Sequence, residues 1–184
     1  MSTGDIDDRL GPEGELEELR LQYPELEEYL SWAWGLKPVR TFFIPYAAGI
    51  SADGKRVYIS YDIQSSVEGI DCESALVRHE TTEWGLRRFC LIGEDYITDP
   101  RGHRLSNRAE HDRIVQLLGG EDAWDIYTEI IDPQVINAER GDFEDRPIPQ
   151  DLALYPYDQE EQEKLITAMW NERSQEEWNK LSAI

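Results

Sequence analysis

The chain has 184 residues, enough for one domain with a hydrophobic core, and 39 Asp and Glu against 18 Lys and Arg give it a formal net charge of -21. A surface this negative is repelled by nucleic-acid phosphates, so direct DNA or RNA binding is not expected. The sequence contains neither the ~20-residue apolar run of a membrane span nor the apolar stretch of a secretory signal. We therefore expect a cytoplasmic protein with no membrane segment.

The N-terminal part of the chain is expected to be helical after a short lead-in. Residues 1–12 are acidic and are predicted to be flexible, and residues 13–184 are predicted to form a single domain. Leucines recur at helical spacing across residues 13–34, but Pro24 interrupts the pattern. This segment is therefore predicted to form two short helices or one broken helix.

Two β-rich runs follow, at residues 41–46 and 56–63. Asp53-Gly54 between them is a strong turn signal. The second run alternates apolar and more polar residues, as a half-buried strand does. The sequence thus predicts a hairpin or small antiparallel sheet.

The rest of the chain has helical periodicity, bounded by capping residues, glycines and prolines. Together with the hairpin, this order of elements predicts a mostly helical α+β fold. The predicted helices cover about residues 71–90, 102–118, 121–131 (ending before Pro133) and 159–181, with an extended covering segment at 141–158.

One short motif on the first of these predicted helices suggests a metal-binding site. Residues 78–86 read RHETTEWGL, in which His79 to Glu83 has the spacing of H-E-x-x-H with a glutamate in place of the second histidine. His79 and Glu83 are four residues apart, so they lie on one helix face and can hold one ion. Glu80 is placed to reach a water on that ion.

A third metal ligand would have to come from the next helix. At about 100° per residue, His103 and Glu110 share a stripe with the apolar residues Ile114 and Leu117, and this stripe should pack against the motif. Either His103 or Glu110 is therefore a candidate third ligand. His111 lies well off the stripe.

Residues 56–118 resemble the zincin-type metallopeptidases, especially their minimal forms. The resemblance implies a Zn²⁺-dependent hydrolase acting on a peptide or protein, with His79 and Glu83 as metal ligands and Glu80 as the general base that activates the metal-bound water. It also implies that residues 57–63 form an edge strand that holds the substrate. The carboxylate at position 83 departs from the family pattern and shifts the preference from zinc towards Mn²⁺ or Fe²⁺.

Two other interpretations remain open. Glu80 and Glu83 could belong to a solvated helix face with Arg78 and Arg87 as salt-bridge partners. The charge of -21 also suits a non-enzymatic protein that binds a basic protein partner, either by mimicking nucleic-acid charge or as a zincin fold without turnover.

Overall fold

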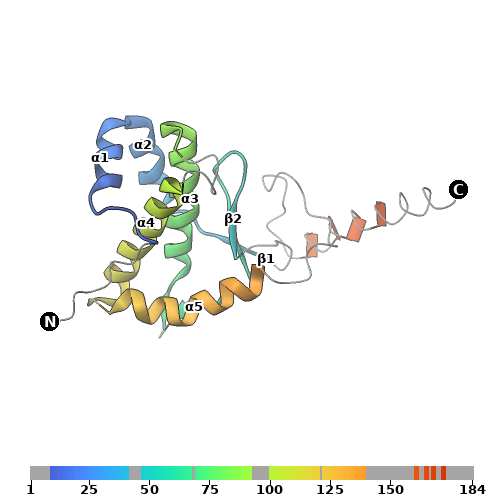
Figure 1. Ribbon diagram of the computed structural model, residues 1–184. Coiled ribbons are helices and arrows are strands. Elements are labelled where there is room, and N and C mark those ends of the chain that lie inside the picture. Colours follow the sequence, from blue (N-terminus) through green and yellow to red (C-terminus); the bar gives the residue numbers. More distant parts are fainter. Residues whose placement is uncertain are drawn as a thin grey trace, which may run out of the picture.

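The computed structural model describes residues 9–41, 47–67, 69–92, 100–120 and 122–139, and a few helical positions between 160 and 172. Within the first five ranges the chain is mostly helical with a small sheet, and the predicted α+β class is confirmed (Figure 1). The helices are α1 (Glu15–Gln22), α2 (Pro24–Ala33), α3 (Glu73–Cys90), α4 (Arg101–Leu118) and α5 (Ala123–Glu139). The strands are β1 (Val39–Thr41), β2 (Ala48–Ile50), β3 (Val57–Ser60), β4 (Ser66–Val67) and β5 (Ile70–Asp71).

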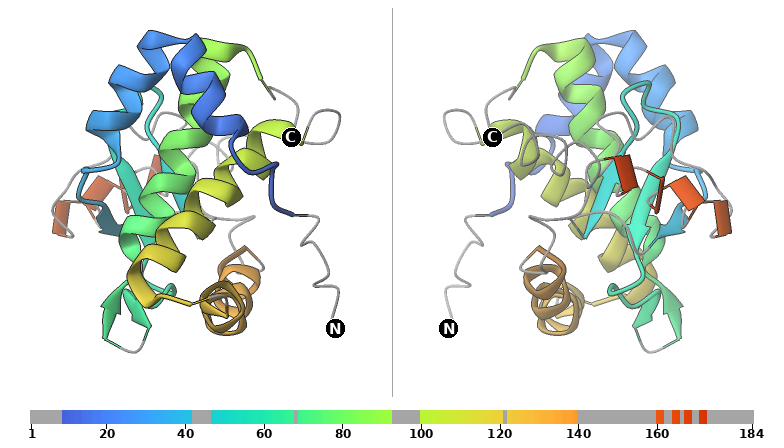
Figure 2. Two further views of the ribbon diagram at one scale, coloured as in Figure 1. Left: turned by 90° about the vertical axis from the view of Figure 1, so that its left-hand side faces the viewer. Right: turned by 90° about the vertical axis from the view of Figure 1, so that its right-hand side faces the viewer.

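Helix α3 is the centre of the fold. It packs along α4 on one side and against β2 and β3 on the other, and its C-terminal half contacts α2. Helices α1 and α2 lie at one end of this assembly, and α5 crosses the opposite end (Figures 1 and 2). Two hydrophobic clusters result, one under α1 and α2 and one between the sheet, α3 and α5.

The main sheet differs from the prediction in two respects. The predicted hairpin joins residues 41–46 to 56–63, but the antiparallel partner of β3 is β2 at Ala48–Ile50, and Thr41 belongs to β1. Strand β1 pairs with β3 in parallel, so the sheet is mixed and its order is β1-β3-β2. β3 is therefore the central strand, and all four of its residues are buried. The expectation that residues 57–63 form a substrate-holding edge strand is wrong, and among the described strands β2 is the edge beside α3. Residues 42–46 lie outside the described residues.

The hairpin turn is anchored to the helices. Gly54 has a φ of +69°, and a Cβ at this position would lie 2.7 Å from the ring of Trp84. Trp84 Nε1 donates to the carbonyl of Ala52 at 3.3 Å, and the Tyr29 hydroxyl donates to the carbonyl of Gly54 at 2.8 Å. The Asp53-Gly54 turn predicted from the sequence thus also fixes the sheet against α2 and α3.

The helix boundaries follow their sequence signals, with one exception. The break at Pro24 separates α1 from α2, because proline is accepted in the first turn of a helix but not in its interior. Helix α5, however, continues through Pro133, so its predicted end at residue 131 is wrong. Ile131 and Val135, on either side of the proline, pack in or against the core, and this packing offsets the lost backbone hydrogen bond.

Residues 9–12, in the segment predicted to be flexible, make contacts with α4. Leu10 is buried, the Gly11 amide donates to the carbonyl of Arg104 at 2.7 Å, and Arg108 Nε donates to the carbonyl of Gly11 at 2.9 Å. This segment therefore lies along α4. Residues 1–8 and 141–158 lie outside the described residues. In the described part of the chain, no helix is both long enough and apolar enough to cross a membrane.

Candidate metal site

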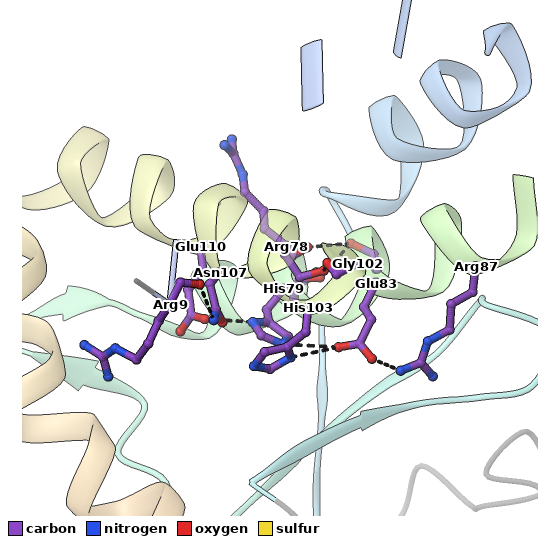
Figure 3. Close-up of polar contacts among 12 residues, drawn as sticks. Arg9, Arg78, His79, Glu83, Arg87, Gly102, His103, Asn107 and Glu110 are labelled. Carbon is purple, nitrogen blue, oxygen red and sulfur yellow. Dashed lines mark hydrogen bonds and ion pairs between the residues drawn. The ribbon is translucent and has the colours of Figure 1, made fainter. Parts of the chain in front are cut away.

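The site is built where α3 and α4 pack together. His79 and Glu83 lie one turn apart on the face of α3 that meets α4, and His103 lies in the first turn of α4. One potential ligand atom from each of these three residues lies within 4.8 Å of the others. Figure 3 shows the three side chains directed at one another. They form a group that could hold a metal ion.

The spacing inside this group suits a small cation. The Oε2 atom of Glu83 is 3.5 Å from Nε2 of His79 and 3.3 Å from Nδ1 of His103. In a tetrahedral site with metal–ligand bonds of ~2.0–2.2 Å, neighbouring ligand atoms are separated by ~3.3–3.6 Å. The two distances that meet at Glu83 are therefore those expected between ligands of one ion.

Glu110 supports His79 and is not a member of the group. Its Oε2 atom accepts a hydrogen bond from Nδ1 of His79 at 2.9 Å, which leaves Nε2 of His79 free to face Glu83. Histidines that bind metals commonly donate their other ring N–H to a carboxylate in this way. Of the two candidates for third ligand, the structure brings His103 into the group and places Glu110 behind His79.

Tyr127 on α5 extends this arrangement, and the sequence reasoning missed it. Its hydroxyl donates to Oε1 of Glu110 at 2.7 Å, so both oxygens of that carboxylate are engaged. Burial raises the pKa of Tyr127 well above its usual value, and the charge of Glu110 adds to this, so the hydroxyl remains a donor. No local pattern singles out this tyrosine from the packing aromatics of the chain.

Arg87 contacts the carboxylate of Glu83 at the oxygen that does not face the two histidines. Its Nη2 atom pairs with Oε1 of Glu83, which leaves Oε2 directed at the two histidines (Figure 3). The guanidinium also offsets part of the negative charge that a carboxylate brings where the zincin pattern has an imidazole. Arg78, the other expected salt-bridge partner, instead stacks over the ring of Trp34, 4.4 Å from its centroid.

The interpretation of a solvated helix face holds only in part: Arg87 pairs with Glu83 as it expects, but Glu80 and Glu83 are both half-buried. The side chains of His79, Glu83 and Glu110 are only 12%, 16% and 9% exposed. Buried or half-buried carboxylates need partners, and each of these has them. His111, which was predicted to lie off the stripe, bonds to its neighbour Asp112 and packs against Trp124, away from the group.

Glu80 lies beside the group and lines the same cavity as His79 and Glu83. Burial raises the pKa of its carboxyl, the charge of His79 opposes this rise, and the charge of Glu110 reinforces it. For His79, burial alone would lower the pKa, but the hydrogen bond to Glu110 and the charge of Glu110 outweigh burial and raise it. The charges of His79 and Glu80 also act directly on each other, since each lies among the causes of the other's pKa shift.

The cavity in front of the group has a volume of about 700 Å³. Its lining combines the candidate ligands with apolar side chains of Leu76 and α5, and with Asp132 of α5, which pairs with Arg9. It is lined by Arg9, Ala47, Ala48, Leu76, His79, Glu80, Glu83, Arg87, His103, Asn107, Glu110, Trp124, Ile131, Asp132 and Val135. A small molecule or an extended segment of chain can therefore reach both the ligand group and Glu80.

The donor set fits a divalent transition metal. Two imidazoles and one carboxylate are a common set of protein ligands for catalytic zinc, in which a fourth position stays open for water or substrate. The same set also holds Fe²⁺ in mononuclear sites, and mixed nitrogen and oxygen donors accept Mn²⁺. The residues present therefore support a metal site of this class without fixing which metal occupies it.

Comparison with known proteins adds no assignment to this geometry. No family model, no curated protein sequence and no solved structure matches the chain.

Proposed function

We propose that the protein is a zincin-like metal-dependent hydrolase that cleaves a peptide or amide bond. The observation that carries this proposal is the convergence of His79, Glu83 and His103 on a cavity that Glu80 also lines. A structural metal site would not require an open cavity of this size or a neighbouring carboxylate. Hydrolysis requires both, because substrate must enter and a proton must be moved.

The proposed roles follow from position. A divalent ion held by the three ligands would supply Lewis acidity, which polarises a carbonyl and lowers the pKa of water. Glu80 removes a proton from the attacking water as the new C–O bond forms, and returns it to the leaving nitrogen as the C–N bond breaks. Glu110 keeps Nε2 of His79 directed at the ligand group, and Arg87 does the same for Oε2 of Glu83.

The cavity also favours one class of substrate. Its lining includes the apolar side chains of Leu76, Trp124, Ile131 and Val135, which suit an apolar group next to the scissile bond. Ala48 of the edge strand β2 lies at the cavity margin. The zincin resemblance then places an extended substrate along β2, in place of the central strand β3.

Zinc is the metal we propose, because the carboxylate of Glu80 next to the group provides the base that zinc hydrolases use. Mn²⁺ and Fe²⁺ are the alternatives that the same donors accept. Elemental analysis of protein expressed without a histidine tag distinguishes the three, and stoichiometric zinc is the expected result.

The activity itself is tested with a library of short peptides and purified protein reloaded with each metal. The wild-type chain should cleave peptides with an apolar residue beside the scissile bond. Glu80→Gln should lower the rate ~10²- to 10⁴-fold while the metal stays bound, because it removes only proton transfer. Glu129→Gln, an exposed glutamate on α5, is the matched control. Equal rates for wild type and Glu80→Gln would overturn the proposed mechanism.

A further inference from the structure

A second recess lies between α2 and α3 and shares no residue with the cavity of the metal site. It has a volume of about 390 Å³ and is lined by Glu25, Glu28, Tyr29 and Trp32 of α2 and Phe89 of α3. The four α2 residues have the spacing of one helix face, which normally carries apolar residues into a core. Here that face combines aromatic rings with carboxylates and is open to solvent.

The rings of the recess are held in a fixed arrangement. Tyr29 is half-buried, with its hydroxyl bonded to the carbonyl of Gly54 and its ring 4.7 Å from that of Trp84. Trp32 and Phe89 flank it at 6.1 Å and 5.9 Å, tilted by 53° and 51°. Trp32 is 50% exposed, which is unusual for so large an apolar side chain. Aromatic faces in such a group attract a cation.

The two carboxylates of the recess strengthen this attraction. Glu25 and Glu28 are exposed, and neither forms an ion pair within the described part of the chain. Glu27 on the same helix, by contrast, pairs with Arg20 at 2.5 Å and accepts a hydrogen bond from Ser31. The negative charge at the recess is therefore available to an incoming group.

The chemistry of the recess selects its occupant. An apolar helix or strand laid over it would desolvate the carboxylates of Glu25 and Glu28 at a cost, and nucleic acid would be repelled by them. A cation satisfies both the rings and the carboxylates. A compact ammonium can contact several tilted rings together, whereas a planar guanidinium stacks best on one face.

We propose that this recess binds a lysine side chain of a basic protein partner. The proposal is independent of the proposed hydrolase activity, since the recess contributes nothing to the metal site. The overall charge of -21 adds long-range attraction for such a partner. The rings and the carboxylates of Glu25 and Glu28 supply the local recognition that net charge alone does not provide.

The test uses the full chain and two five-residue alanine peptides, one with a central lysine and one with a central norleucine, which has the apolar stem without the charge. Titration calorimetry at low ionic strength should show binding of the lysine peptide and at least ~10-fold weaker binding of the norleucine peptide. Trp32→Ala should weaken lysine binding ~3- to 10-fold. The double variant Glu25→Gln, Glu28→Gln should weaken it to a similar extent while the rings stay in place.

Leu21→Ala, at another exposed apolar residue, is the matched control and should bind the lysine peptide as wild type does. Thermal unfolding of each variant verifies that the fold is retained. Equal binding of the two peptides would overturn the proposal, and so would unchanged lysine binding by both the Trp32 and the double glutamate variants.

Discussion

Glu83 and Glu110 of the metal site and the two glutamates of the recess on α2 stand in opposite situations. In the metal site, Glu83 and Glu110 are largely buried, and the structure engages both oxygens of each. In the recess, Glu25 and Glu28 are exposed and have no ion-pair partner within the described residues. The two regions share α3: the metal site lies between α3 and α4, and the recess lies between α2 and α3.

This difference shows why net charge alone says little about function. Carboxylates with fixed partners keep a set geometry, which a small ion of definite coordination requires. Carboxylates without partners beside aromatic faces suit a larger organic cation that arrives from outside. The formal charge of -21 includes both kinds. The substitutions below distinguish the two kinds of carboxylate.

The largest effect on metal binding is expected from a direct ligand. His103→Ala should weaken Zn²⁺ binding more than ~100-fold, because losing a ligand costs more than the 10- to 100-fold typical of its hydrogen-bonded supports. His111→Ala, also on α4 but outside the group, should bind zinc as wild type does. Competition with a chromogenic chelator measures both affinities. Equal effects of the two substitutions would remove His103 from the site.

A smaller effect on zinc binding is expected from substitutions of Glu110 and Tyr127, which lie behind His79. Glu110→Gln should weaken zinc binding ~10- to 100-fold, since the amide holds the imidazole less firmly and does not raise its basicity. Tyr127→Phe should cost less than Glu110→Gln, because Glu110 keeps its bond to His79. The same chelator competition ranks the variants. A larger loss for Tyr127→Phe than for Glu110→Gln would contradict the proposed order of support.

Arg87 should contribute least among the residues of the metal site. Its side chain is 43% exposed, and exposed ion pairs contribute ~0.2–1 kcal/mol, so Arg87→Gln should weaken zinc binding by less than ~5-fold. Arg88→Gln, on the next residue of α3, is the control. A loss as large as that of His103→Ala would mean that Arg87 does more than orient Glu83.

A substitution in one region is expected to leave binding at the other region unchanged. Trp32→Ala should leave zinc affinity unchanged, and His103→Ala should leave binding of the lysine peptide unchanged, because the two sites share no lining residue. Chelator competition measures the zinc affinity of Trp32→Ala, and titration calorimetry measures lysine-peptide binding by His103→Ala. A change in either direction would show that α3 couples the two regions.

Most helix boundaries of this structure were predictable from the sequence, whereas the end of α5 and the pairing of the strands were not. Apolar periodicity, Pro24 and the Gly119-Gly120 pair mark the helices around residues 13–34 and 71–118, because these signals act within a few residues. The central position of β3 depends on its pairing with β1, a three-residue strand whose partner no local pattern specifies. The residue pattern of 56–63 is equally compatible with an edge strand and with a central strand of the sheet.

Some of the candidate metal ligands were likewise predictable from local spacing, and others depend on how the helices pack. His79 and Glu83 are recognisable from helical spacing, and the stripe on α4 narrowed the third ligand to His103 or Glu110. The choice between them, and the part played by Tyr127, depends on how α4 and α5 approach α3. Likewise, nothing local distinguishes Trp32, which lines an open recess, from Trp124, which is buried.

The most direct test of the central claim is an anomalous-scattering map from crystals grown with excess Zn²⁺. The account predicts one strong peak between α3 and α4, at ~2.0–2.2 Å from Nε2 of His79, from the carboxylate of Glu83 and from a ring nitrogen of His103. Well-ordered side chains at these three positions with no anomalous peak among them would contradict it.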